Sequence, residues 1–408
     1  YFQYDSKKTG GITISHLRFG DNPIKSTYYI SKADFVACHN PSYMLKGFNI
    51  VNDVKPGGTF LLNCQWTPEE IAEHLPAETL KYIAKNNINF YIVNAIDKAR
   101  EIGMGKRTNT ILQSAFFALA NILPMEDAVD YMKKAAYKSY SKKGDAIVKM
   151  NYDAIDAGVN AIVKIDVPAS WANLSDDTPE DPATGSRPEL VKFVNNIVLP
   201  ATKMQGDALP VSVFVDHADG TFPQGSAAYE KRGVAVDVPQ WLPENCIQCN
   251  QCAYVCPHAT IRAFALDADE AANAPAATKL LQMRGKGTEE YKFAISISPL
   301  DCMGCALCAN VCPAKTKALV MVPQESQHEQ QEVFNYMTSS VTKKQTPFAD
   351  TTLKGSQFNQ PLLEFSGSCA GCAETSYARL ITQLFGERMY ISNATGCSSI
   401  WGGSAPAT

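Results

Sequence analysis

This sequence lacks long apolar runs, and it carries little net charge. No uninterrupted apolar stretch approaches the roughly 20 residues that a helix needs to cross a bilayer, so we expect a soluble protein without a membrane span. The 37 basic and 41 acidic residues leave a formal net charge of −4. Because nucleic-acid-binding proteins present a marked positive charge, this balance gives no sign of a nucleic-acid partner.

Cysteine, by contrast, is plentiful, and its spacing is informative. The sequence has 13 cysteines, and eight of them form two copies of the pattern C-x2-C-x2-C-x3-C-P. Bacterial ferredoxins with two clusters bind [4Fe–4S] through this run. Zinc sites pair two C-x2-C units across a spacer, and disulfide frameworks belong to short secreted chains, so neither explains a doubled run with proline at the same place. We therefore expect two cubane clusters.

The same spacing rule predicts which cysteines bind which cluster. Three closely spaced thiolates cover one face of a cubane, whereas the fourth ligates the neighbouring cluster. The first predicted set is Cys246, Cys249, Cys252 and Cys312, and the second is Cys302, Cys305, Cys308 and Cys256. Electrons could then pass between two adjacent clusters.

Other side chains near these runs, and two isolated cysteines, carry further predictions. Three apolar residues should shield the clusters from water, which helps to set their potential: Ile247, Tyr254 and Val311. His258 follows the first run directly; it could hydrogen-bond near a cluster, but we expect it at the surface. Cys38 and Cys64 stand alone, and we expect them to be buried packing residues.

The fold class predicted for residues 1–184 is α/β. Apolar and β-branched runs predict strands at 12–14, 35–37, 59–62 and 90–93. Between them, one helix should begin at Pro68 with Thr67 as its N-cap, and a buried helix should cover 111–122, capped by Thr108 or Asn109. This alternation predicts a largely parallel sheet in a three-layer domain.

The remaining sequence divides into three further regions. A polar, proline-containing stretch at 176–188 predicts a linker, and residues 185–240 read as a connecting region with one strand candidate at 211–215. Residues 241–342 form an α+β ferredoxin-like module with an internal repeat, and we expect 268–287 to be a helical insertion in it. Residues 343–408 carry a third cysteine group.

This third group consists of a lone C-x2-C, Cys369 and Cys372, followed by Cys397 in a glycine-containing loop. Three thiolates do not complete a cubane, so a fourth ligand would have to come from elsewhere. On spacing alone, a redox-active or purely structural pair remains an open alternative. The loop at 393–399 offers N–H and hydroxyl donors that suit a diphosphate, and Gly396 permits close backbone approach. Glu374 follows two residues after Cys372 and, on the sequence alone, could be a surface residue.

The order of these motifs resembles pyruvate:ferredoxin oxidoreductase of the long single-chain type. The paired runs, residues 369–375 and residues 393–398 carry the resemblance, and residues 6–20 resemble the family's γ-type domain. The resemblance implies a γ-type domain on the CoA side, a dicluster domain, and the first part of a thiamine diphosphate-binding α/β domain from 343 to 408. Because the sequence begins at Tyr1 without methionine, we expect an internal part of a longer protein.

The implied activity is the oxidative decarboxylation of pyruvate with CoA to acetyl-CoA and CO2. Thiamine diphosphate with Mg2+ would start the reaction, and three [4Fe–4S] clusters would pass electrons to ferredoxin or flavodoxin. By resemblance, the third cluster binds Cys369, Cys372 and Cys397, with its fourth ligand outside these residues. Glu374 and Cys397 correspond to thiamine diphosphate contacts. The family's catalytic residues do not occur in this sequence, which should therefore be inactive alone.

CoA contacts are the least specific expectation. A glycine-containing segment, 103–110, precedes a helix and brings cations to its positive end, which would suit a phosphate, although it has neither Walker nor Rossmann spacing. With the resemblance, we expect Lys8, Asn109 and Asn151 to contact CoA. The alternative for Asn109 is a helix cap, and for Lys8 a solvated charge.

Two alternatives to this reading stay open. One is the body of a pyruvate:NADP oxidoreductase, and the other is an electron-transfer module without catalysis. The family suggests a homodimer. Exposed thiolate clusters oxidise easily, which favours a reducing, anaerobic interior. The expected location is the cytoplasm, or the hydrogenosome if the source is an anaerobic eukaryote.

Overall fold

The computed structural model describes residues 2–4, 7, 10–25, 28–48, 50–105, 107–175 and 182–401. The chain divides into two compact units. Unit 1 comprises His16–Pro182 and Pro200–Leu209, and unit 2 comprises Phe2–Ser15, Ala183–Leu199 and Pro210–Thr408. The four expected domains stay a prediction, and the two units are described separately below.

Unit 1 is built on a four-stranded sheet whose order is β3-β4-β5-β6. Its strands are β3 (Ala33–Cys38), β4 (Val54–Asn63), β5 (Asn89–Val93) and β6 (Ile162–Lys164). The first three run parallel, and β6 pairs antiparallel with β5. The predicted strands at 35–37, 59–62 and 90–93 are confirmed, as is the largely parallel sheet.

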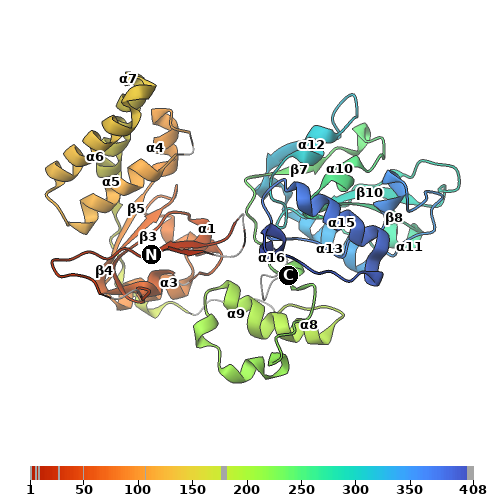
Figure 1. Cartoon of the computed structure of the whole chain (residues 1–408), viewed down its shortest axis with the longest axis horizontal. Coiled ribbons are helices and arrows are strands. Elements are labelled where there is room, and N and C mark those ends of the chain that lie inside the picture. The colour runs from red at the N-terminus through yellow and green to blue at the C-terminus, as the bar shows by residue number, and fades with distance from the viewer. Residues whose placement is uncertain are drawn as a thin grey trace. The chain divides into compact units, whose positions relative to one another are not determined.

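Helices cover both faces of this sheet (Figure 1). One face packs against α1 (Ser42–Leu45), α2 (Ile71–His74) and α3 (Ala77–Lys85), and the other against α4 (Ala95–Ile102), α5 (Asn109–Ala120) and α7 (Asp145–Asn160). The helix α6 (Met125–Tyr140) packs on α5 and α7. Alternate strand residues serve the two cores: Phe60 and Leu62 point to the first, and Leu61 to the second. The predicted three-layer arrangement is confirmed.

Three local predictions in this part of the chain need correction. The helix expected from Pro68 begins only at Ile71, because the backbone N–H of Thr67 donates to the Glu70 carboxylate at 2.8 Å and the chain turns there. The helix α5 is confirmed, but Thr108 makes no side-chain cap, and only one face of the helix is fully buried. The strand expected at 12–14 is β2 (Thr13–Ser15), which pairs antiparallel with β1 (Phe2–Tyr4) and does not join the four-stranded sheet.

The prediction of a strand at 211–215 is wrong. After Pro210 the chain forms a 3-10 helix over Val211–His217. Val211 is 87% exposed and Val215 is 68% exposed, whereas Val213 packs against a small core formed by residues 190–198. Two short helices, α8 (Pro188–Phe193) and α9 (Leu199–Thr202), precede this 3-10 helix in the sequence.

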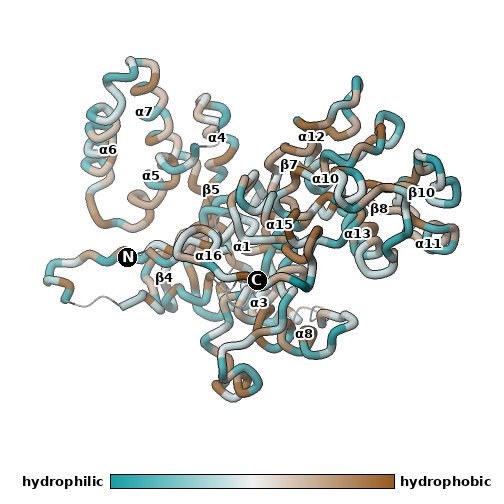
Figure 2. Tube along the Cα trace, turned by 45° about the vertical axis from the view of Figure 1, so that its right-hand side comes forward, coloured by the Kyte–Doolittle hydropathy of each residue, from teal (hydrophilic) through white to brown (hydrophobic). Residues whose placement is uncertain are grey.

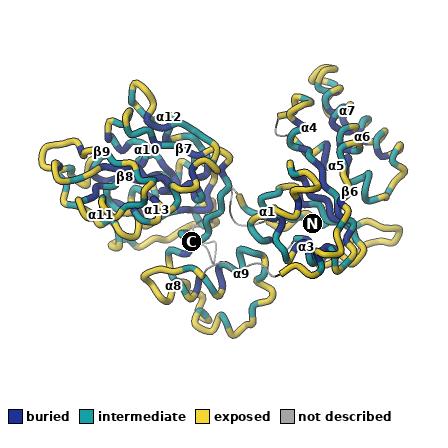
Figure 3. The backbone as a smooth tube through the Cα atoms, turned by 180° about the vertical axis from the view of Figure 1, so that it is seen from behind, coloured by how far each residue is buried: buried dark blue, intermediate teal, exposed yellow. Residues whose placement is uncertain are grey.

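The repeat expected in the ferredoxin-like module is visible in its strand pairing. β7 (Asp237–Trp241) precedes the first cysteine run and pairs antiparallel with β11 (Leu319–Pro323), which follows the second run. In the same way, β10 (Lys292–Ile297) precedes the second run and pairs with β8 (Ile261–Leu266), which follows the first. Each run ends in a one-turn helix, α10 (Gln251–Val255) or α12 (Leu307–Val311). The strands β7, β8 and β10 are mostly buried, and β11 is mostly half-buried (β7 and β8 are labelled in Figure 3).

The insertion at 268–287 is not the helix that we expected. Only α11 (Ala268–Ala272) is helical, held by a capping box between Asp267 and Glu270, and the chain then runs without helix to the short strand β9 (Leu281–Gln282). Its far end contacts the first cysteine run: the side chain of Gln248 donates to the Gln282 carbonyl at 2.8 Å and accepts from the Arg284 N–H at 2.8 Å. The insertion therefore braces a cysteine loop.

Four helices complete unit 2: α13 (Glu329–Ser340), α14 (Leu353–Ser356), α15 (Ala373–Phe385) and α16 (Cys397–Trp401). The apolar segments in Figure 2 are short and interrupted by polar residues. Across the described ranges, no helix has both the length and the apolar character to cross a membrane.

Candidate functional site

The two cysteine runs share an unusual backbone conformation. Gln248 and Gly304, each two residues after the first cysteine of its run, have positive φ angles of 60° and 68°. Two residues later, Asn250 and Ala306 have φ angles of 62° and 61°. Residues other than glycine rarely adopt this region, and they do so where the surrounding structure requires it. The repeat thus extends from the strand pairing to the loop conformation itself.

This conformation turns backbone donors toward sulfur. The N–H of Gln248 donates to Sγ of Cys246 at 3.4 Å, and the N–H of Gly304 donates to Sγ of Cys302 at 3.4 Å. Such donors favour the thiolate over the thiol. The loops therefore fit a group that binds cysteine as thiolate, and hydrogen bonds to the sulfurs are one way in which a protein sets a cluster's potential.

The thiol neighbours fall into two groups. Burial raises the pKa of Cys252, and the charges of the nearby thiols of Cys246, Cys249 and Cys312 raise it further. Burial also raises the pKa of Cys302 to about 12, and the nearby thiols of Cys256 and Cys305 add to this rise. In each group, the last cysteine of one run lies near the first cysteines of the other run.

No disulfide joins the cysteines of the two runs. All 13 cysteines are among the described residues, and each is a free thiol, so no disulfide competes for them. In the part of the chain that the structure describes, no three His, Cys, Asp or Glu side chains converge on a single metal ion. A cubane spreads its four thiolates over four iron corners, and it releases their protons on binding.

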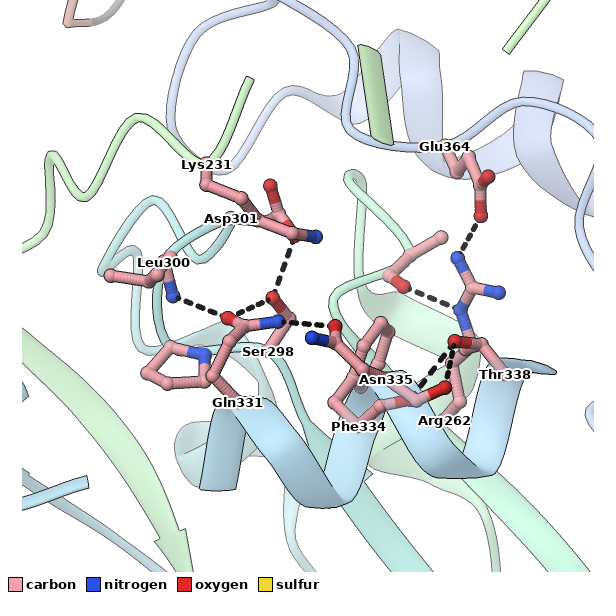
Figure 4. A network of polar contacts seen from close by, with 12 residues as sticks. Lys231, Arg262, Ser298, Leu300, Asp301, Gln331, Phe334, Asn335, Thr338 and Glu364 are labelled. Atoms are coloured by element: carbon pink, nitrogen blue, oxygen red, sulfur yellow. Dashed lines mark hydrogen bonds and ion pairs between the residues drawn. The ribbon is translucent and has the colours of Figure 1, made fainter. Parts of the chain in front are cut away.

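A buried polar network holds the second run in place (Figure 4). Asp301, which precedes Cys302, is 9% exposed and pairs with Lys231 at 2.5 Å. Burial raises the pKa of Asp301, and the lysine opposes that shift. Ser298 lies 2.6 Å from the same carboxylate and 2.9 Å from the Gln331 side chain on α13. The network fixes the entry to the second cysteine run.

Two predictions about residues flanking the first run are wrong. Ile247 is 49% exposed and shields little, although Tyr254 and Val311 are half-buried. His258 is 2% exposed rather than at the surface, and its Nδ1 lies 3.2 Å from the Ser366 carbonyl. Burial lowers the pKa of His258 to about 4, with the carbonyls of Ser366 and Cys369 opposing that shift.

The loop between Cys369 and Cys372, part of the third cysteine group, lies beside the second run. Gly371 lies between Cys369 and Cys372, and its backbone hydrogen-bonds the Cys305 thiol. Burial raises the pKa of Cys305, and this hydrogen bond opposes the rise. A Cβ on Gly371, whose φ is +75°, would lie 3.4 Å from the Cβ of Cys305. Position 371 therefore suits glycine, and the C-x2-C loop touches a predicted cluster ligand.

The other predicted residues of this region lie on two helices. Cys372 is the N-cap of α15, and Glu374 is half-buried in the first turn of that helix. Cys397 is exposed and begins α16. The Gly396 N–H lies 3.0 Å from Oγ of Ser399, so one expected donor for a diphosphate has an internal acceptor.

The predicted CoA contacts differ in accessibility. Asn109 is exposed at the start of α5. Asn151 is 4% exposed on α7, and its amide donates to the Ile147 carbonyl at 2.8 Å, so a ligand could not reach it without displacing that bond. Lys8 lies outside the described residues.

The buried positions of Cys38 and Cys64 are confirmed, at 2% and 1% exposure. Burial raises the pKa of Cys38 to about 12 and that of Cys64 to about 11, so both stay protonated and poorly reactive.

We predict that Cys38→Ser and Cys64→Ser leave the iron content of the protein unchanged. Iron analysis checks this, and a loss of about four iron atoms in either variant would contradict it.

Comparison with known proteins agrees with these features. The family described as pyruvate ferredoxin/flavodoxin oxidoreductase matches residues 1–161, a domain of unknown function called EKR matches 177–235, and a 4Fe-4S dicluster domain matches 245–316. The pyruvate-flavodoxin oxidoreductase of Klebsiella pneumoniae is 52% identical over 407 residues, which cover 100% of this chain and 34% of that protein.

Two further relatives align over the whole chain. The pyruvate:ferredoxin oxidoreductase of Moorella thermoacetica is 51% identical and is covered to 34% of its length. The NADP(+) pyruvate dehydrogenase of Cryptosporidium parvum is 43% identical and is covered to 22%. The chain thus spans about a third, or less, of the curated relatives that it matches. It belongs to the pyruvate ferredoxin/flavodoxin oxidoreductase family and contains a 4Fe-4S dicluster domain.

Proposed function

We propose that this chain forms the electron-exit part of an enzyme that oxidises pyruvate with CoA to acetyl-CoA and CO2. The observation that carries the proposal is the contact between Gly371 and Cys305. This contact connects two parts of the chain. One is the loop that we propose binds the cluster nearest thiamine diphosphate, and the other is the second cysteine run. Electrons that enter at Cys369 and Cys372 therefore have a short path into the dicluster domain.

The proposed ligands follow the crossed scheme. The first cluster takes Cys246, Cys249, Cys252 and Cys312, the second takes Cys302, Cys305, Cys308 and Cys256, and the third takes Cys369, Cys372 and Cys397 with one ligand outside the sequence. The two groups of neighbouring thiols support the first two assignments. The thiols of both Cys256 and Cys252 are close enough to raise the pKa of Cys308, which supports two clusters lying next to each other.

Thiamine diphosphate, when bound with Mg2+, supplies the carbanion chemistry that releases CO2 from a 2-oxoacid. Within this chain, Glu374 would hold the aminopyrimidine, and the loop at Cys397 would lie against the diphosphate. Asn109 is the candidate CoA contact that is open to a ligand. The buried thiols and the half-buried Tyr254 and Val311 keep water from the clusters.

The test is an anaerobic assay of the full-length protein that contains this chain. Pyruvate should reduce methyl viologen only when CoA is present, with ferredoxin or flavodoxin replacing the dye as physiological acceptor. A protein that carries its clusters yet reduces no viologen with pyruvate and CoA would contradict the proposal and favour an electron-transfer module without catalysis.

The Cryptosporidium parvum relative motivates one alternative, in which the same body passes its electrons to NADP+. Adding NADP+ in place of viologen distinguishes the two. Formation of NADPH at a comparable rate would favour that alternative, and viologen or flavodoxin reduction without NADPH would favour the first proposal.

A further inference from the structure

Arg379 is a fully buried cation beside the first cysteine run. It lies on α15, is 1% exposed, and is the largest fully buried side chain among the described residues. Its Nε donates to the carbonyl of Cys256 at 2.9 Å, and its Nη2 donates to the carbonyl of Tyr254 at 2.5 Å. Two contacts of the guanidinium are therefore to the end of one cysteine run.

The acceptors around Arg379 are all uncharged. Besides the two carbonyls, Nη1 donates to Oε1 of Gln357 at 3.3 Å and to Oε1 of Gln383. Within the described ranges, no carboxylate pairs with Arg379. The nearby guanidinium of Arg262 has a carboxylate partner, Glu364 (Figure 4).

A buried charge without a counter-charge is costly, because the protein interior solvates ions poorly. Arginine nevertheless stays protonated in proteins. The thiolate of Cys256, whose carbonyl accepts from Nε of Arg379, and the cluster that this thiolate would bind, would place negative charge next to this cation.

We propose that Arg379 is the internal counter-charge of the cluster bound by Cys256, and that it raises the reduction potential of this cluster selectively. Net charge and hydrogen bonding near a cluster set its potential, and a fixed cation favours the state that holds one more electron. The inference rests on the proposed clusters, but not on pyruvate as substrate.

The position of Arg379 gives this charge a role in electron flow. The helix α15 begins at Ala373, directly after Cys372, so one helix links the third cysteine group to the guanidinium. A cation that raises the potential of the next cluster favours electron transfer away from the third group. Arg379 thus acts as a positioning and tuning residue, and not as a catalytic one.

Three variants of the anaerobically purified full-length protein separate charge from packing. Arg379→Gln removes the charge, and Arg379→Lys keeps the charge while losing the planar fork that binds both carbonyls. Gln357→Glu retains Arg379 and gives it a carboxylate partner at an existing contact. Arg388→Gln is the control, because Arg388 is an exposed arginine just beyond the same helix.

The readout is the midpoint potential of each cluster, measured by EPR-monitored redox titration. In Arg379→Gln and Gln357→Glu, the reduced-to-oxidised ratio of one cluster should fall about tenfold at a fixed solution potential, equivalent to about 59 mV. The affected cluster should be the one that is lost in Cys256→Ala. Arg379→Lys should retain most of the native potential, and Arg388→Gln should retain all of it.

A packing role alone would give a different pattern. It predicts equal disturbance in Arg379→Gln and Arg379→Lys, and no shift in Gln357→Glu, and this pattern would overturn the proposal. If Arg379→Gln does not take up clusters, Gln357→Glu decides the matter, since it leaves the arginine in place. Native potentials in Gln357→Glu would then refute the inference, even if the enzyme oxidises pyruvate normally.

Discussion

Replacing Cys256 by alanine should remove the cluster of the second run while sparing the cluster of the first. Cys256 belongs to the first run by sequence, but its thiol lies close enough to Cys302 and Cys305 to raise the pKa of both. A cubane that loses one of four thiolates becomes labile, so about four iron atoms per chain should be lost. EPR spectroscopy together with iron analysis measures the effect.

The reciprocal variant, Cys312→Ala, is the matched control for this result. The Cys312 thiol lies close enough to Cys252 to raise its pKa, so the first-run cluster should be lost and the second retained. Each variant removes the last cysteine of one run. If the substitutions simply damaged the fold, both clusters would be affected in both variants. Loss of the first-run cluster in Cys256→Ala would show that the ligands do not cross.

Replacing Glu374 by alanine should weaken thiamine diphosphate binding about 10- to 100-fold, because hydrogen bonds to charged groups contribute about 1.5–3 kcal/mol. The half-buried carboxylate lies two residues after Cys372, in the first turn of α15. Isothermal titration calorimetry of the apoenzyme with Mg2+ and thiamine diphosphate measures the change.

Glu387→Ala is the control for this variant, because Glu387 is an exposed carboxylate near the far end of the same helix. It should bind thiamine diphosphate as the native protein does. Native affinity in Glu374→Ala would assign Glu374 to the surface role that the sequence also allowed. Loss of iron in Glu374→Ala would instead indicate a structural effect on the neighbouring cysteines.

The cysteine runs show what sequence can predict well. Their spacing is local, and the loops at Gln248 and Gly304 repeat one conformation wherever the motif occurs. The strands β3, β4 and β5 were equally readable, because each is an apolar run bounded by helical patterns. In both cases the information lies within a few neighbouring residues.

The wrong predictions concern residues whose surroundings depend on contacts that are distant in the sequence. His258 is buried because residues near 366, more than 100 positions later, cover it. The apolar run at 211–215 looks like a strand, but nothing in its sequence shows that it lacks a neighbouring strand to pair with. The hydrogen bond from Asn151 to Ile147 depends on the helix α7, which brings the two residues together. Arg379 was missed for the same reason: its sequence neighbours do not reveal that its acceptors belong to the first cysteine run.

The central claim is that three clusters, and not two, connect the site of pyruvate oxidation to the carrier. Iron and acid-labile sulfide counted per polypeptide, with EPR spin integration of the fully reduced full-length protein, test it most directly. The account predicts about twelve iron atoms and three reducible clusters. About eight iron atoms and two clusters, in protein that is otherwise fully loaded, would contradict it.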